Sequence, residues 1–239
     1  MSQLVRPHYY VPGEDPYSGG EGSTTKASQD VGDWAILDST PATCTQLGLF
    51  HLFQSKPPID VVVSGPNYGK NVTALFSLSS GTLGGALEAA TFRYRAVALS
   101  FAFWSRAHDP ALIGPACKHA VRLVEHLTDN WGESVDLYSV NVPLVKGVDT
   151  AKVYLTPVLD NRWRSGSSFE EVSTDDVEED AEDKEKVIRE NREKGVKSAN
   201  GTGHERRFRW KPTFADVQAS IDESEEGNDG WAVTKGCTR

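Results

Sequence analysis

The most constraining feature of this sequence is a short valine-rich run at residues 59–63 that ends in a segment rich in glycine and asparagine. A run of valines of this length is typical of a strand buried in a sheet. The residues that follow, 64–71, predict a loop, and a helix is predicted to begin at Gly81. Open α/β sheets bind ligands at the carboxyl ends of their strands, where the loop and the next helix present backbone N–H groups. We therefore expect the functional residues in this segment.

The rest of the chain continues the alternation of strand and helix signals. Thr40 and Pro41 provide an N-cap and a first helical residue for a helix predicted to end at Phe53. Three further segments have the spacing of a strand, a helix and a strand, at 96–103, 115–130 and 137–142. Strands and helices in this order form right-handed crossovers. The pattern predicts an α/β fold with a mostly parallel sheet and helices on its faces.

Three segments depart from this alternation, although we treat residues 1–239 as one α/β domain. Their composition predicts a polar loop at 12–30, an acidic excursion at 170–204 and a C-terminal strand and helix extension at 205–239. The excursion has too few apolar residues to order itself by burial.

Within the C-terminal extension, the sequence predicts three elements. They are a strand at 206–210, a helix that begins at Thr213 and a last strand at 230–236. The arginines of the first strand alternate with aromatic residues, as they do on some surfaces that bind nucleic acids. We favour the interpretation that this strand covers the core and that its arginines balance the acidic residues.

The charge and cysteine content limit the classes of partner. A formal net charge of -9 argues against electrostatic binding of a nucleic acid duplex or an anionic membrane over a broad surface. The three cysteines are far apart, which fits reduced thiols better than a disulfide framework. The first residues lack the apolar core of a signal peptide, and no run of apolar residues has the length of a membrane span. We expect a soluble, cytoplasmic protein.

The residues after the valine-rich run have the chemistry of a phosphate site. Gly65 permits backbone N–H groups to converge on an anion, and Asn67 and Asn71 carry neutral amide oxygens that a hard cation accepts. Ser80, Gly81 and Thr82 add hydroxyls and free N–H groups at a helix start. The same residues also suit an ordinary connection between a strand and a helix, and the pattern alone leaves both interpretations open.

Several motifs resemble the SurE family of stationary-phase survival proteins, which are metal-dependent phosphatases and nucleotidases. The resemblance is strongest to the fungal-type branch, and it extends in family order through nearly the whole chain. The motifs that carry it are at 61–71, 79–89, 39–44, 96–103, 138–143 and 228–233.

The resemblance implies a fold, an activity and a set of site residues. The fold is a Rossmann-like three-layer sandwich whose C-terminal extension serves in dimerisation, so a homo-oligomer is expected. The activity is phosphomonoester hydrolysis of the acid phosphatase or 5′/3′-nucleotidase type, with a nucleoside monophosphate as one substrate and one divalent ion, Mg²⁺ or Mn²⁺, as cofactor. Asn67 falls on a metal-ligand position, and Asn71, Ser80 and Thr82 fall on or beside positions that face the phosphate.

One part of the family pattern is missing from this sequence. Family members begin with an apolar strand that ends in Asn-Asp-Asp-Gly, and its aspartates supply most of the negative charge around the metal. The only adjacent aspartates here, Asp175 and Asp176, lie in the acidic excursion and not at a strand end. We therefore expect an N-terminally incomplete SurE-like chain that holds its metal weakly, with no catalytic residue assigned. The alternative is a non-catalytic pseudoenzyme or dimerisation module built on the same fold.

Overall fold

The computed structural model describes residues 4–11, 23–25, 34–54, 57–103, 109–172 and 207–239. Most of the predicted polar loop, the acidic excursion beyond Val172, Asp175, Asp176 and Arg206 lie outside the described residues. The chain divides into two compact units, one made of residues 1–162 and 220–239 and the other of residues 163–219. We describe each unit by itself.

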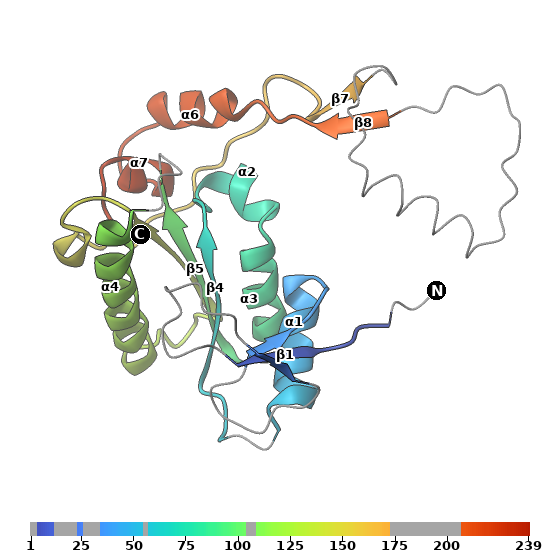
Figure 1. Cartoon of the computed structure of the whole chain (residues 1–239). Coiled ribbons are helices and arrows are strands. Elements are labelled where there is room, and N and C mark those ends of the chain that lie inside the picture. Colours follow the sequence, from blue (N-terminus) through green and yellow to red (C-terminus); the bar gives the residue numbers. More distant parts are fainter. Residues whose placement is uncertain (1–3, 12–22, 26–33, 55–56, 104–108, 173–206) are drawn as a thin grey trace, which may run out of the picture. The chain divides into compact units, whose positions relative to one another are not determined.

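A three-stranded parallel sheet forms the centre of the first unit (Figure 1). Its strands are β4 (Val61–Tyr68), β5 (Arg95–Ala102) and β6 (Leu137–Pro143), in the order β4-β5-β6. All seven residues of β6 pair with β5 in an unbroken parallel register. The prediction of a parallel α/β sheet is confirmed.

Strand β4 is longer than the sequence predicted. We expected a loop from residue 64, whereas the strand continues through Asn67 and Tyr68, which pair with Ser100 and Phe101. The register shifts between Ser64 and Asn67, so the glycine and proline there form an irregularity inside the strand. Glycine and proline mark bulges as well as strand ends, and the sequence pattern did not separate these two cases.

Helices cover both faces of the sheet, and side-chain size decides which helix lies on which face (Figure 1). The larger β5 side chains, Val97, Leu99 and Phe101, pack with residues of α4 (Pro110–Asp129). Ala96 and Ala98 point to the other face, where they meet Ala86 and Ala89 of α3 (Gly81–Thr91). Alternate residues of a strand face opposite sides, so this pattern produces the three layers.

The other helices of the first unit refine the sequence prediction. Helix α1 (Pro41–Leu47) continues as a π-helical turn, η1 (Gly48–Leu52), close to the predicted end. Helix α4 begins earlier than residue 115, because the Asp109 side chain accepts the Ala111 N–H and Pro110 takes the first helical position. Helix α2 (Thr73–Leu78) was not predicted.

The chain ends differently from the prediction. Residues 230–236 do not form a strand; they belong mainly to α7 (Asp229–Thr234). The Asn228 side chain accepts the Trp231 N–H at 2.9 Å, and this N-cap starts a helix where the aromatic and β-branched residues had indicated a strand. Beyond α7, Arg239 pairs with Asn141 of β6 through two backbone hydrogen bonds.

Short antiparallel sheets and helices make up the remaining described elements. One sheet contains β1 (His8–Val11), β2 (Ser23–Thr25) and β3 (Trp34–Ile36). In the second unit, β7 (Phe169–Val172) pairs with β8 (Arg207–Trp210), which confirms a strand at that place. Helix α6 (Phe214–Asp222) and the 3₁₀ turn η2 (Val148–Thr150) complete the set.

One arginine of β8, Arg209, takes part in an ion pair. Glu170 of β7 accepts from Arg209 and from Lys211, and these contacts lower the pKa of Glu170, chiefly through Lys211.

Among the described residues, we find no helix that combines the length and the apolar character needed to span a bilayer.

Candidate functional site

Asn67 lies within β4, near its carboxyl end, and not in the loop that the sequence predicted. Its side-chain amide donates to the Gly69 carbonyl at 2.9 Å, and the Gly69 N–H in turn donates to Phe101 of β5 at 3.0 Å. Gly69 has a φ of 155°, and a Cβ there would lie 3.3 Å from the Asn67 amide nitrogen. The end of the strand is therefore held in one conformation by contacts within the sheet and its own turn.

Gly65 has a structural reason to be glycine. Its φ is 125°, and a Cβ at this position would lie 2.2 Å from the Leu99 carbonyl oxygen of β5. Any other residue would clash with the neighbouring strand. The requirement comes from the sheet itself, and a contact between Gly65 and a phosphate stays a prediction.

Asn71 anchors the loop to the sheet. It is only 7% exposed, and its side-chain amide donates to the Ser100 hydroxyl at 2.8 Å. Its backbone N–H donates to Asn141 Oδ1 at 2.8 Å, and the Asn141 amide donates back to the Asn71 carbonyl at 3.2 Å. Buried polar groups are stable only when paired in this way. The contacts fix the loop against β5 and β6, and a phosphate contact of Asn71 stays a prediction.

The first N–H groups of helix α2 are all used by distant parts of the chain. Thr73 donates to Asp229 Oδ2 at 2.7 Å, Ala74 to the Leu159 carbonyl at 2.8 Å, and Leu75 to Asn161 Oδ1 at 3.2 Å. The N-cap residue Val72 offers no side-chain acceptor. These donors are normally free at a helix start. Because these three N–H groups are occupied here, they are not available to a phosphate.

Helix α3 starts in the opposite way. The Ser80 hydroxyl accepts the Leu83 N–H at 3.2 Å and thus forms an N-cap. Across the described part of the chain, the backbone N–H groups of Gly81 and Thr82 meet no acceptor. Gly81 is exposed and Thr82 half-buried, and a helix start carries partial positive charge. Among the predicted residues, Ser80, Gly81 and Thr82 thus form the one stretch whose geometry suits an anion.

The starts of α1 and α3 lie against each other. A Cβ on Gly81 would lie 3.1 Å from Pro41 Cγ, and a Cβ on Gly85 would lie 2.6 Å from Ser64 Oγ of β4. The Thr45 hydroxyl of α1 donates to the Gly85 carbonyl at 3.0 Å. Small residues on α3 therefore allow two helix starts and β4 to approach closely.

A cavity of about 510 Å³ lies between α1 and β4. Five consecutive residues of β4, 61–65, line one side of it, and Leu49 and Phe53 line the other. In the described sheet, β4 is an edge strand, and the cavity lies beside it. Its walls are mainly apolar, with Ser39 and Ser64 among the polar members.

The described residues do not fit a divalent metal ion by themselves. Within them, no three histidine, cysteine, aspartate or glutamate side chains come close enough together to hold a metal. Asn67 contributes one neutral amide oxygen, whereas Mg²⁺ and similar ions bind through carboxylates and phosphates. That the chain binds its metal weakly stays a prediction.

One lysine lies in the loop itself. Lys70 is half-buried between Gly69 and Asn71. Burial lowers its pKa from the ordinary value of a lysine, while the charge of Asp222 acts in the opposite direction. The loop therefore carries one cationic side chain that is partly removed from water.

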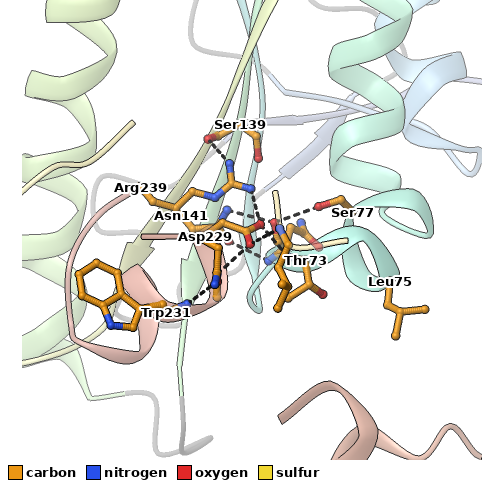
Figure 2. A network of polar contacts seen from close by, with 12 residues as sticks. Thr73, Leu75, Ser77, Ser139, Asn141, Asp229, Trp231 and Arg239 are labelled. Carbon is orange, nitrogen blue, oxygen red and sulfur yellow. Dashed lines mark hydrogen bonds and ion pairs between the residues drawn. The ribbon is translucent and has the colours of Figure 1, made fainter. Parts of the chain in front are cut away.

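The sequence analysis missed a buried ion pair next to this loop. Asp229 is fully buried and accepts from Arg239 Nη2 at 2.8 Å (Figure 2). Burial lowers the pKa of Arg239, and Asp229 counteracts that effect. The signal that could have revealed Asp229 was the Asn228-Asp229-Gly230 run, because asparagine followed by an acidic residue marks a helix start.

The described elements define a class of protein: an α/β protein with a parallel sheet, helices on both faces, and a helix, α3, whose first N–H groups meet no acceptor among the described residues. Residues 15–165 match the family model described as Survival protein SurE. The chain belongs to the SurE family.

Individual relatives agree with this assignment. The chain is 39% identical over 139 residues to a protein named 5′-nucleotidase SurE from Ruegeria pomeroyi, and the match covers 55% of this chain and 51% of that protein. It is 34% identical over 210 residues to the probable tubulin--tyrosine ligase PBY1 of Saccharomyces cerevisiae, with 86% of this chain and 26% of the yeast protein covered. The chain thus spans about half of the bacterial relative and about a quarter of the yeast relative.

A solved structure supports the fold. The crystal structure of the SurE protein from Aquifex aeolicus superposes with a TM-score of 0.52 at 22% identity, and it covers 86% of this chain and 67% of that one. This likeness confirms the Rossmann-like α/β architecture. The match to the yeast protein is consistent with the fungal-type branch that the sequence indicated.

Proposed function

We propose that this chain forms the phosphate-binding part of a phosphomonoester hydrolase of the SurE type, with a nucleoside monophosphate as a representative ligand. Family membership and relatives named 5′-nucleotidase support this class of activity. The observation that carries the proposal is the start of α3, where Gly81 and Thr82 keep N–H donors available beside the capped Ser80. Backbone N–H groups at a helix start are a common way to bind phosphate.

The proposed contribution of the chain is binding and orientation. The Gly81 and Thr82 N–H groups bind two phosphoryl oxygens, and the Thr82 hydroxyl supplies a further donor. Ser80 holds the helix start in place, while the turn at Asn67 and Gly69 keeps the loop rigid. The described residues do not fit Mg²⁺ or Mn²⁺ by themselves, so we derive no catalytic step through a metal. No described residue is assigned to bond cleavage.

A second candidate is a non-catalytic binding or dimerisation module on the same fold. The observation that favours it is that the described residues bring together no three metal-binding side chains. In this case the chain binds phosphate esters and releases no phosphate. The homo-oligomer that the family resemblance implies belongs to both candidates, and light scattering of the purified chain would measure it.

The name of the yeast relative describes a different activity. This chain covers 26% of that protein, and a name given to the whole yeast chain includes the part that is not shared. We propose no ligase activity for the present chain.

The test measures binding and hydrolysis separately. The full chain is titrated with adenosine monophosphate by calorimetry, and release of phosphate from p-nitrophenyl phosphate is followed with Mn²⁺ and with a chelator. Thr82→Val removes the hydroxyl but keeps the side-chain shape, and we expect it to weaken binding by at least about tenfold, because a hydrogen bond to a charged group is worth roughly 1.5–3 kcal/mol. Thr91→Val, at the other end of α3, is the matched control.

Each outcome decides one point. Metal-dependent phosphate release that Asn67→Ala abolishes would favour the hydrolase. Binding without release would favour the module. A native chain with no measurable affinity for adenosine monophosphate or inorganic phosphate would contradict the phosphate-binding proposal in both forms.

A further inference from the structure

The carboxylate of Asp229 accepts hydrogen bonds from four N–H groups. Oδ2 accepts from Thr73 N at 2.7 Å and from Arg239 Nη2 at 2.8 Å. Oδ1 accepts from Leu159 N at 2.9 Å and from the N–H of Gly230 at 2.8 Å. A carboxylate has about four acceptor sites, so Asp229 is fully used. It joins three segments that are far apart in the sequence, as Figure 2 shows for the part around Thr73 and Arg239.

Thr73, the first residue of α2, has an unusual backbone conformation. Its φ is 65°, in the left-handed region, although threonine is β-branched. Such a conformation persists only when surrounding contacts hold it. The hydrogen bond from the Thr73 N–H to Asp229 is such a contact, and it acts at the residue that is strained.

Further hydrogen bonds connect Asp229 to the predicted site loop. Arg239 pairs with Asp229 through its side chain and with Asn141 through its backbone. Asn141 in turn bonds to Asn71, which is two residues before Thr73. These hydrogen bonds, together with the short piece of chain from Asn71 to Thr73, form a closed ring that also includes Asp229, Asn141 and Arg239. Each of these five residues is at most 9% exposed to solvent.

We propose that Asp229 is a positioning residue for phosphate binding: by holding the backbone of Thr73, it sets the start of α2 and thereby the placement of α3 relative to Asn67. Only the short helix α2 and two further residues separate Thr73 from Gly81, so a change in the Thr73 backbone alters the position of the α3 start. Asp229 also occupies the N–H donor at the start of α2, which leaves α3 as the helix start for a phosphate. The inference rests on the proposed function and names a residue that does not contact the ligand.

The experiment uses the full chain with three variants: Asp229→Asn, Thr73→Gly and the double variant. Asp129→Asn, an exposed aspartate at the end of α4, is the control. Adenosine monophosphate affinity is measured by calorimetry well below the unfolding temperature. The backbone amide signals of residues 71, 73, 81 and 82 are followed by NMR without ligand.

We expect Asp229→Asn to fold, to shift the Thr73 and Asn71 amide signals, and to bind adenosine monophosphate at least fivefold more weakly. Glycine adopts a positive φ without strain. Adding Thr73→Gly to Asp229→Asn should therefore restore affinity to within about twofold of Thr73→Gly alone. A residue that served only overall stability would not be rescued by a glycine at this position.

Two results would refute the positioning role of Asp229, and a third would refute the proposed function separately. Unchanged amide signals and native affinity in a folded Asp229→Asn protein would overturn it. If Asp229→Asn alone does not fold, the double variant is compared with Thr73→Gly, and a tenfold loss there would show that Asp229 does not act through Thr73. If the native chain binds no phosphate, the proposed function fails, whereas unshifted Thr73 and Asn71 signals would refute the positioning role independently.

Discussion

Helices α2 and α3 follow each other along the chain, and their starts are built in opposite ways. At α2, the first N–H groups donate to Asp229, Leu159 and Asn161, so the positive end of the helix is neutralised from within the protein. At α3, a local serine caps the helix, and the Gly81 and Thr82 N–H groups stay available. The difference teaches that a helix start is an anion site only where the protein has not already supplied the anion.

The largest effect is expected from breaking the α2 start. Asp229→Ala leaves the Arg239 guanidinium buried without its charged partner and removes the acceptor of the Thr73 N–H. Loss of one member of a buried ion pair costs about 3–5 kcal/mol. Urea unfolding should show this loss in the free energy of unfolding, while Asp160→Ala, whose partner Arg162 is exposed, should change it by less than about 1 kcal/mol. Equal effects of the two substitutions would mean that the α2 start does not depend on Asp229.

A smaller effect is expected at the α3 start. Ser80→Ala removes the N-cap, and such substitutions cost about 1 kcal/mol. Ser79→Ala is the matched control, because the adjacent Ser79 hydroxyl is exposed and donates to the preceding helical turn. Thermal unfolding of the two variants compares them directly. A larger loss for Ser79→Ala would show that the α3 cap is assigned to the wrong serine.

The smallest effect concerns pH and the segment that carries Arg239. His119 of α4 is buried and bonds to the Thr238 hydroxyl at 3.0 Å. Burial lowers the pKa of His119, the Arg122 charge lowers it further, and Asp149 raises it. As the pH falls below 6.5, the ordinary pKa of a histidine, His119 takes up a proton in the unfolded chain but stays neutral to lower pH in the folded chain. Stability is therefore lost from about that pH down to the folded pKa, and it is not lost further below.

The measurement is the free energy of unfolding between pH 7.5 and 5. We expect His119→Gln to reduce its decrease with falling pH by an amount on the order of 1 kcal/mol or less. His126→Gln, at an exposed histidine on the same helix, is the matched control. A steeper slope in His119→Gln would reverse the sign that we derive.

Local patterns were enough to predict much of the fold. The apolar run of β5 and the capped start of α3 carry their signals within a few residues, and both elements appear where they were expected. Helix α7 was missed because Trp231 and Val233 favour strands, whereas the Asn228 cap decided the outcome. The end of β4 was missed because Gly65 and Pro66 lie inside a strand irregularity.

The contacts around the proposed site were predicted less completely than the fold, for a physical reason. The sequence pointed to Ser80, Gly81 and Thr82 because an N-cap is a local feature. It did not indicate that the Asp229 carboxylate would accept the Thr73 N–H, since these residues are 156 positions apart and meet only in the folded chain. Contacts of that range follow from the tertiary fold and not from the spacing of residue types.

The most direct test of the account follows the backbone amide signals of both helix starts during one titration with adenosine monophosphate. We predict progressive shifts for Gly81 and Thr82, with the Thr73, Ala74 and Leu75 signals unchanged because their N–H groups are already bonded. Shifts concentrated at Thr73, Ala74 and Leu75, with Gly81 and Thr82 unaffected, would contradict it.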